Sequence, residues 1–231
     1  FVRHNMGGEL VTSAYRRPAL LALEHIEKKY LFHFLPGSRT LSLGTAGCNL
    51  GCKYCINWRI SQTGPDGAET LVTPEAVVAQ AVAAGVEIIA FTYTEPTIFF
   101  EYARDIAHRA QQAGLAVVAK SNGYMTPDAL VEMARWLDGI NIDLKGWRGP
   151  EHSRMVGGEL DVVLDNLRLA RQLGLWLEVS SLLVPGLNTD SVALQGMAGF
   201  IAGELGVDTP WHVLRFFPNY LLTEARPTSQ Q

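Results

Sequence analysis

Short apolar stretches alternate along the chain with longer amphipathic ones, and this pattern repeats from residue 41 to residue 216. The short stretches have the length and residue content of buried strands, and the longer ones have the spacing of helices. Two helical stretches open on Thr-Pro followed by an acidic residue, at Thr73 and Thr126, which predicts capped first turns. We expect strands at 41–44, 87–93, 115–119, 139–144, 175–184 and 211–216, and helices at 74–84, 97–113, 127–136, 160–173 and, capped by Asn188, up to residue 205.

This alternation predicts an α/β fold in which helices cover a parallel sheet. Six alternations fall short of the eight that close a full barrel, so the expected fold is a partial (β/α)6 TIM-like barrel. We expect residues 41–220 to form this core, residues 1–40 to be an N-terminal extension packed on it, and residues 221–231 to be a C-terminal tail. Polar residues that follow the strands are then the candidates for an active site.

The composition narrows the class of protein. Hydrophobic residues make up 48% of the 231 residues, enough for a sizeable core, and the net charge of −4 disfavours nucleic acids and anionic membranes as partners. The most apolar window, 71–91, is interrupted by charged and polar residues, so we expect no membrane span. An odd number of cysteines favours a reducing, cytoplasmic location, and a chain that opens on Phe1 is expected to be part of a longer protein.

The three cysteines lie within eight residues, at Cys48, Cys52 and Cys55. A tetrahedral structural zinc site takes four ligands, so zinc would need a further ligand from a distant part of the chain. An iron–sulfur cubane held by three cysteines would leave one iron open to an exogenous ligand, which suits chemistry more than passive electron transfer. A structural zinc and a set of unmetallated thiols remain the alternatives.

The spacing Cys48-x3-Cys52-x2-Cys55, with Tyr54 before the last cysteine, resembles the motif of radical S-adenosylmethionine (SAM) enzymes. The resemblance implies a [4Fe-4S] cluster on the three cysteines, SAM on the open iron, and Tyr54 beside the cofactor. It also implies reductive cleavage of SAM to a 5′-deoxyadenosyl radical that abstracts hydrogen from a substrate. A low-potential donor of the flavodoxin or ferredoxin type would supply the electron.

Later segments resemble the SAM-binding motifs of the same superfamily, in the expected order: Thr94-Glu95-Pro96-Thr97, Lys120-Ser121-Asn122-Gly123, Asp143-Leu144-Lys145 and Leu183-Val184-Pro185-Gly186. The resemblance places Thr94 and Glu95 near the SAM amino group. It places Ser121, Asn122, Asp143 and Lys145 near the ribose and carboxylate, and Val184 near the adenine. Tyr93 and Thr94 stand where the superfamily usually has two glycines.

Within the superfamily, residues 27–220 resemble the radical SAM component of the AmmeMemoRadiSam group, a relative of pyruvate formate-lyase activating enzymes. Gly51 and the Ile56-Asn57 pair depart from the residues expected in that cluster loop. The implied substrate is a glycyl-type site on a partner protein or a small biosynthetic metabolite. An iron–sulfur electron-transfer protein and a zinc-stabilised binding module are the alternative functions.

Each candidate also has a purely structural interpretation. Glu95 can be a first-turn carboxylate with Thr94 as the cap, and Asp143 and Lys145, two apart on a strand, can form an ordinary salt bridge on one face. The catalytic candidates are Lys145, His212 and Arg215. His212 and Arg215 are three apart on a strand, so they are expected to face opposite ways, with at most one in the site.

Overall fold

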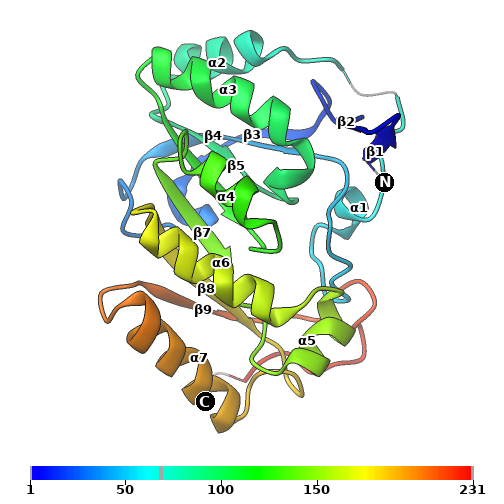
Figure 1. Ribbon diagram of the computed structural model, residues 1–231, viewed down its shortest axis with the longest axis vertical. Helices are drawn as coiled ribbons and strands as arrows, with labels where there is room; N and C mark the ends of the chain where they lie inside the picture. Colours follow the sequence, from blue (N-terminus) through cyan, green and yellow to red (C-terminus); the bar gives the residue numbers. More distant parts are fainter. Residues whose placement is uncertain (1, 68–69, 230–231) are drawn as a thin grey trace.

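A seven-stranded sheet forms the centre of the computed structural model, which describes residues 2–67 and 70–229; Phe1 and the last two residues of the expected tail lie outside this description (Figure 1). Its order follows the chain: β3 (Pro18–His25), β4 (Arg39–Thr45), β5 (Ile88–Phe91), β6 (Ala116–Ser121), β7 (Gly139–Asp143), β8 (Trp176–Leu183) and β9 (Trp211–Arg215). The six strands from β4 to β9 are parallel, whereas β3 pairs antiparallel with β4. In the described residues β3 and β9 are the two edges, so the barrel is partial, as the sequence predicts.

Helices cover the outer face of this sheet (Figure 1). They are α2 (Pro74–Ala83), α3 (Phe100–Gln112), α4 (Pro127–Met133), α6 (Leu160–Gln172) and α7 (Ser191–Phe200), which runs on into a π-helical turn, η3 (Ile201–Leu205). The remaining elements are the 3₁₀ helices η1 (Ile26–Lys29) and η2 (Pro96–Phe99), the helices α1 (Trp58–Ser61) and α5 (Gly149–Val156), and a hairpin of β1 (Arg3–Met6) and β2 (Glu9–Thr12). No helix in the described part of the chain is long and apolar enough to cross a membrane.

Alternate residues of the strands enter two different apolar clusters. On β5, Ile89 and Phe91 face the helices, whereas Ile88 and Ala90 face the inside of the partial barrel. Residues 26–34 pack on that inner face through Ile26, Leu31 and Phe34. The half of the barrel at the amino ends of the strands, called the lower half below, is therefore filled by residues that precede β4. The strand pleat produces this division, because successive side chains point to opposite faces of a sheet.

Both Thr-Pro helix starts are confirmed: Thr73 accepts a hydrogen bond from the Ala76 backbone, and Thr126 accepts one from Ala129. The expected cap at Asn188 is wrong. Asp190 caps α7 by accepting from Ala193 N, and Asn188 instead closes the turn after β8. Its Oδ1 accepts from Val184 N at 2.7 Å and its Nδ2 donates to Leu182 O at 2.9 Å.

Other boundaries shift for local reasons. The strand expected at 87–93 ends at Phe91, because Tyr93 adopts a left-handed conformation with φ of 68°. The single helix expected at 97–113 is a 3₁₀ turn followed by α3, with Glu95 rather than Thr94 as the cap of η2. The β1–β2 hairpin, β3 and α5 are further elements that the sequence pattern did not predict.

Candidate active site

A cavity of about 990 Å³ lies at the carboxyl ends of the parallel strands. Its walls include ten of the residues that the sequence singles out: Cys48, Cys52, Tyr54, Cys55, Thr94, Glu95, Ser121, Asn122, Asp143 and Lys145, with Arg215 at the rim. These residues are spread over more than half of the sequence and meet because parallel strands all end at one edge of the sheet.

The cysteine loop is held by its backbone. Gly47 N donates to Ile60 O at 2.7 Å, which ties the start of the loop to α1. Gly51 N donates to Val156 O at 2.9 Å, and Lys53 N donates to Met155 O at 3.0 Å, so the end of α5 fixes its middle. The unpredicted helix α5 therefore positions the cysteines.

Cys48 and Cys52 lie in surroundings that disfavour a free thiolate. Burial, helped by the nearby Glu95 carboxyl, raises the pKa of Cys48 to about 12, and burial raises the pKa of Cys52 to about 11. Cys55 Sγ lies 3.3 Å from Ser61 Oγ. Thiols of this kind become metal ligands when a bound cation compensates their negative charge.

Tyr54 carries an unsatisfied polar group into the cavity wall. Its side chain is buried, and its hydroxyl is among the few buried side-chain atoms of the described residues that have no hydrogen-bond partner. Burial raises the pKa of this phenol well above its usual range. A buried hydroxyl without a partner costs free energy, so its position between Cys52 and Cys55 fits contact with a bound group.

Glu95 is fully buried and its carboxylate is satisfied by its neighbours. It accepts from Asn122 N at 2.8 Å, from Ser121 Oγ at 3.0 Å and from Thr97 N at 3.2 Å. Burial raises its pKa, and these donors oppose the shift. Glu95 therefore caps η2 and also orients the turn after β6, and its role toward the SAM amino group remains a prediction. At that turn Gly123 has φ of 72°, and a Cβ there would meet Ile142 at 2.8 Å.

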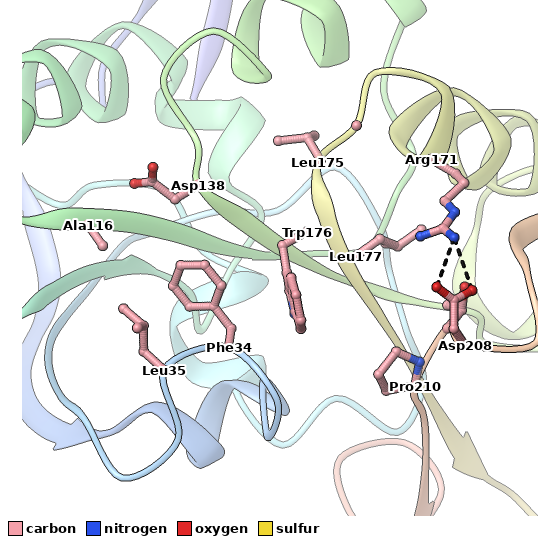
Figure 2. A pocket seen from close by; sticks show the side chains of 12 residues that line it. Phe34, Leu35, Ala116, Asp138, Arg171, Leu175, Trp176, Leu177, Asp208 and Pro210 are labelled. Carbon is pink, nitrogen blue, oxygen red and sulfur yellow. Dashed lines mark hydrogen bonds and ion pairs between the residues drawn. The ribbon is translucent and has the colours of Figure 1, made fainter.

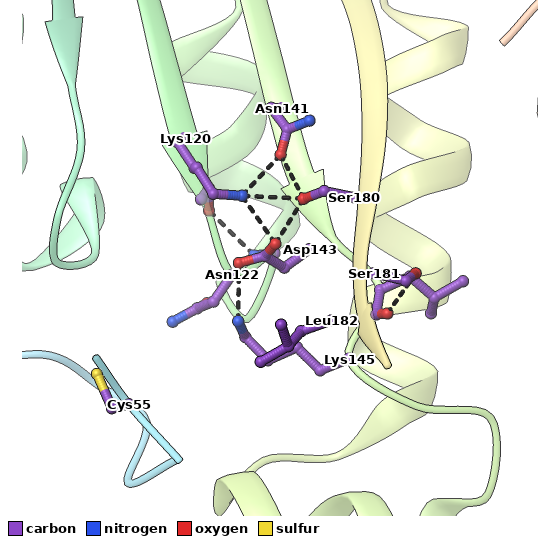
Figure 3. Close-up of polar contacts among 12 residues, drawn as sticks. Cys55, Lys120, Asn122, Asn141, Asp143, Lys145, Ser180, Ser181 and Leu182 are labelled. Atoms are coloured by element: carbon purple, nitrogen blue, oxygen red, sulfur yellow. Dashed lines mark hydrogen bonds and ion pairs between the residues drawn. The ribbon is translucent and has the colours of Figure 1, made fainter. Parts of the chain in front are cut away.

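A charged network occupies the centre of the site (Figure 3). Lys120 Nζ donates to Asp143 Oδ1 at 2.7 Å, Asn141 Oδ1 at 2.8 Å and Ser180 Oγ at 2.9 Å, and Lys145 Nζ donates to Asp143 Oδ2 at 2.7 Å. Burial acts against the charge on Asp143, but the two ammonium groups hold its pKa below the usual range. Burial lowers the pKa of Lys120, whereas Asp143 outweighs burial and raises that of Lys145. Two cations around one carboxylate leave a net positive charge for an anionic ligand group.

The chain before β4 supplies a further wall that sequence reasoning missed. Glu24 forms an ion pair with the buried Lys29 and accepts from the Tyr93 hydroxyl at 2.7 Å, while Lys29 Nζ lies 4.7 Å from the Tyr93 ring centroid. Burial opposes the charge on Glu24, but hydrogen bonds from Lys29 and Tyr93 lower its pKa to about 2. Tyr93 stands where the superfamily usually has glycine, and this substitution is the sequence signal that the cavity wall differs here.

Three of the candidate site residues, Val184, Arg215 and His212, lie away from the centre of the cavity. Val184 is buried beside the cysteine loop, in a small apolar cluster with Leu50, Tyr54 and Phe216. Arg215 is at the rim, where its Nε donates to Thr228 O at 3.1 Å. His212 faces the lower half of the barrel, where its Nε2 lies 2.6 Å from Glu178 Oε2, so the two residues do point different ways as expected. The catalytic and adenine-contact roles given to these residues remain predictions.

Lys120 belongs to the candidate segment 120–123, but its position in the sequence assigns it no individual role. It lies on the face of β6 that points inward, two residues beyond the buried Val118. A lysine that follows apolar residues on the inward side of a strand is the signal that could have identified it. Asn57, whose Nδ2 donates to Tyr93 O at 2.7 Å, holds the cysteine loop against β5.

The pattern of the Radical SAM superfamily matches residues 42–194, and the chain belongs to this superfamily. An uncharacterized protein of Methanocaldococcus jannaschii, MJ0808, is 38% identical over 227 residues, which cover 98% of this chain and 67% of that protein.

Solved structures share the fold. A domain of a pyruvate-formate lyase-activating enzyme from Bacteroides vulgatus aligns with a TM-score of 0.52 at 20% identity, over 61% of this chain and 84% of that one. Streptococcus suis SuiB bound to S-adenosylmethionine aligns with a TM-score of 0.62 at 12% identity, over 79% of this chain and 42% of that one.

Enzymes of this superfamily use a [4Fe-4S] cluster and SAM, and the residues present fit both groups. The chain has three cysteines, all in the cavity wall, so a cubane held by them keeps one iron open. The unpartnered Tyr54 hydroxyl and the positively charged network beside the cysteines suit a zwitterionic ligand.

Proposed function

We propose that this chain cleaves SAM at a cluster held by Cys48, Cys52 and Cys55 and uses the radical to abstract hydrogen from a substrate in the same cavity. The observation that carries the proposal is the shared cavity: the three thiols, Glu95 and the Lys120–Asp143–Lys145 network line one space. When bound, the cluster and SAM supply one-electron reduction and a reactive carbon radical.

The protein's own part is to bind, orient and exclude water. Lys145, fixed by Asp143, would hold the carboxylate of SAM by a charge-assisted hydrogen bond, and Lys120, whose three N–H groups already have acceptors, would add positive charge. Glu95, Ser121 and Asn122 would fix the turn that meets the amino and ribose groups. Apolar residues in the wall, Leu182, Leu214 and Phe216, would keep water from the reacting carbon.

The cavity mouth favours a polypeptide substrate, as for an activating enzyme. Ile56, Val213 and Phe217 line it and are 70%, 51% and 60% exposed. Exposed apolar side chains grouped at a cavity are typical of surfaces that bind another chain. A small metabolite is the second candidate, favoured by the charged and aromatic groups of Glu24, Lys29 and Tyr93 deeper in the wall.

The electron donor and the location follow from the chemistry proposed. Cleavage of SAM needs a low-potential one-electron donor, which we propose to be a flavodoxin or ferredoxin. Three thiols that must stay reduced are compatible with the cytoplasm.

Deuterium transfer tests the proposal. Anaerobically reconstituted, reduced protein is incubated with SAM and either a peptide deuterated at glycine or deuterated small metabolites. Deuterium in 5′-deoxyadenosine identifies the substrate class. A protein that holds four irons but releases no 5′-deoxyadenosine with any reductant would instead be an electron-transfer protein, and one that holds only zinc after reconstitution would be a zinc-stabilised module.

A further inference from the structure

A second group of metal-ligating side chains lies away from the cysteines. His33 follows η1, Glu178 is on β8 and His212 is on β9, and one donor atom from each lies within 4.8 Å of the others. His33 Nδ1 is 3.3 Å and His212 Nε2 is 2.6 Å from the same oxygen, Glu178 Oε2. Three elements that are far apart in sequence thus bring two imidazoles to one carboxylate oxygen.

We propose that His33, Glu178 and His212 form a mononuclear site for a divalent transition metal of the zinc type. Two imidazoles and one carboxylate are a common ligand set for Zn²⁺. With metal–ligand bonds of about 2.0–2.2 Å, a tetrahedral site separates its ligand atoms by about 3.3 Å. The distance from His33 Nδ1 to Glu178 Oε2 already has this value. The distance from His212 Nε2 to the same oxygen would need to increase by less than an ångström.

The carboxylate is built into the fold in a way that leaves one oxygen for the metal. Glu178 has a fully buried side chain. Its Oε1 accepts from His33 N at 2.9 Å, Phe34 N at 3.1 Å and Trp176 Nε1 at 3.0 Å, so that oxygen is satisfied. Its Oε2 accepts from Phe32 N at 3.0 Å and faces both imidazoles. Such hydrogen bonds fix the orientation of a metal-binding carboxylate.

The site has an open side. The side chain of His33 is 60% exposed, whereas those of Glu178 and His212 are 0% and 13% exposed. A metal on the three atoms therefore keeps its remaining position toward solvent, where a water molecule completes the coordination. Phe32 packs on the His212 ring, with centroids 4.9 Å apart.

The proposed metal site lies apart from the cluster site. Glu178 precedes Ser180 by two residues on the inward face of β8, so it lies about 7 Å toward the amino end of the strand. At that end a second cavity, of about 610 Å³, has Phe34 and Trp176 in its wall (Figure 2). The metal would join the segment after η1 to the last two strands, and this inference does not depend on the proposed SAM chemistry.

Metal content of the reconstituted protein tests the site. Cluster-loaded protein is dialysed against buffered micromolar Zn²⁺, and zinc and iron are counted per chain. We expect one zinc in addition to four irons, and zinc affinity at least about tenfold weaker in His33→Ala and in His212→Ala, with the iron unchanged. The matched control is His108→Ala, an exposed histidine on α3, which should keep the zinc.

A second variant removes the competing thiols. In Cys48→Ser/Cys52→Ser/Cys55→Ser protein, one Zn²⁺ should still bind, and Co²⁺ in its place should give the visible absorption of a tetrahedral site. Adding His33→Ala should abolish both signals. Wild-type protein without zinc, zinc that persists in His33→Ala/His212→Ala, or zinc lost in the triple serine variant would overturn the site and leave Glu178 as an ion-pair partner only.

Discussion

The inward face of the sheet has two halves that differ in chemistry although they belong to the same strands. Toward the amino ends, Ile88 and Val118 pack on Ile26, Leu31 and Phe34 of the segment 26–34. Toward the carboxyl ends, the same face carries Lys120 and Asp143 beside the cysteine loop. Apolar packing and charged groups are therefore separated along the strand direction, so changes in one half should be separable from changes in the other.

The largest effect is expected from Cys52→Ala, at the reactive end. Two thiolates cannot hold a stable cubane in a solvent-accessible cavity, so iron and sulfide content and 5′-deoxyadenosine release should fall to background. The fold should persist, because Cys52 lies outside the two clusters that pack the sheet. Iron analysis, product chromatography and circular dichroism check this, and unchanged turnover would remove the cysteine from the cluster.

Asp143→Ala should give the next largest effect. It leaves Lys120 and Lys145 without the carboxylate that both contact at 2.7 Å. Removing one partner of a buried ion pair costs about 3–5 kcal/mol of stability or of ligand affinity. We expect SAM affinity to fall strongly while the cluster is retained, with Glu95→Ala having the same direction. Equilibrium binding of SAM measures this, and unaltered affinity in both variants would exclude the two residues from the SAM site.

Glu178→Gln probes the opposite half. In the wild-type protein three backbone N–H groups and an indole N–H donate to the two carboxylate oxygens of Glu178. The amide of glutamine offers these four donors one accepting oxygen. In metal-free buffer the free energy of unfolding should fall by about 1–3 kcal/mol, the cost of an unsatisfied buried donor. SAM cleavage per cluster should stay near the wild-type rate. A denaturant titration measures the stability, and a loss of cleavage without loss of stability would contradict the division between the halves.

The smallest effect is a pH dependence from Glu24, which lies in the cavity wall. Its pKa falls from 4.5 to about 2 on folding, so its stabilising contribution is present above pH 4.5 and is lost as the pH falls toward 2. Solvent reduces the contribution to about 1–2 kcal/mol. Unfolding of the cluster-free protein between these pH values should be less pH-dependent in Glu24→Gln, and identical profiles would argue against the ion pair with Lys29.

Much of the site could be predicted because its residues follow recognisable strands. The cysteine spacing and the segments at Glu95, Ser121 and Asp143 are local features, and the parallel sheet brings their ends together. His33 and Glu178 could not be found this way. The segment after η1 has no pattern that places it inside the barrel, and Glu178 reads as an ordinary polar residue within an apolar strand.

The six parallel strands, the Thr-capped helices and the three-thiol motif are local features of the chain, because hydrophobic periodicity, capping and ligand spacing act over a few residues. Long-range packing, by contrast, places residues 26–34 inside the barrel, brings Lys120 to Asp143, and turns His212 toward Glu178 instead of the cavity. These contacts join residues up to 146 positions apart. Their partners are chosen by packing and by the need to satisfy buried charge, which no local pattern records.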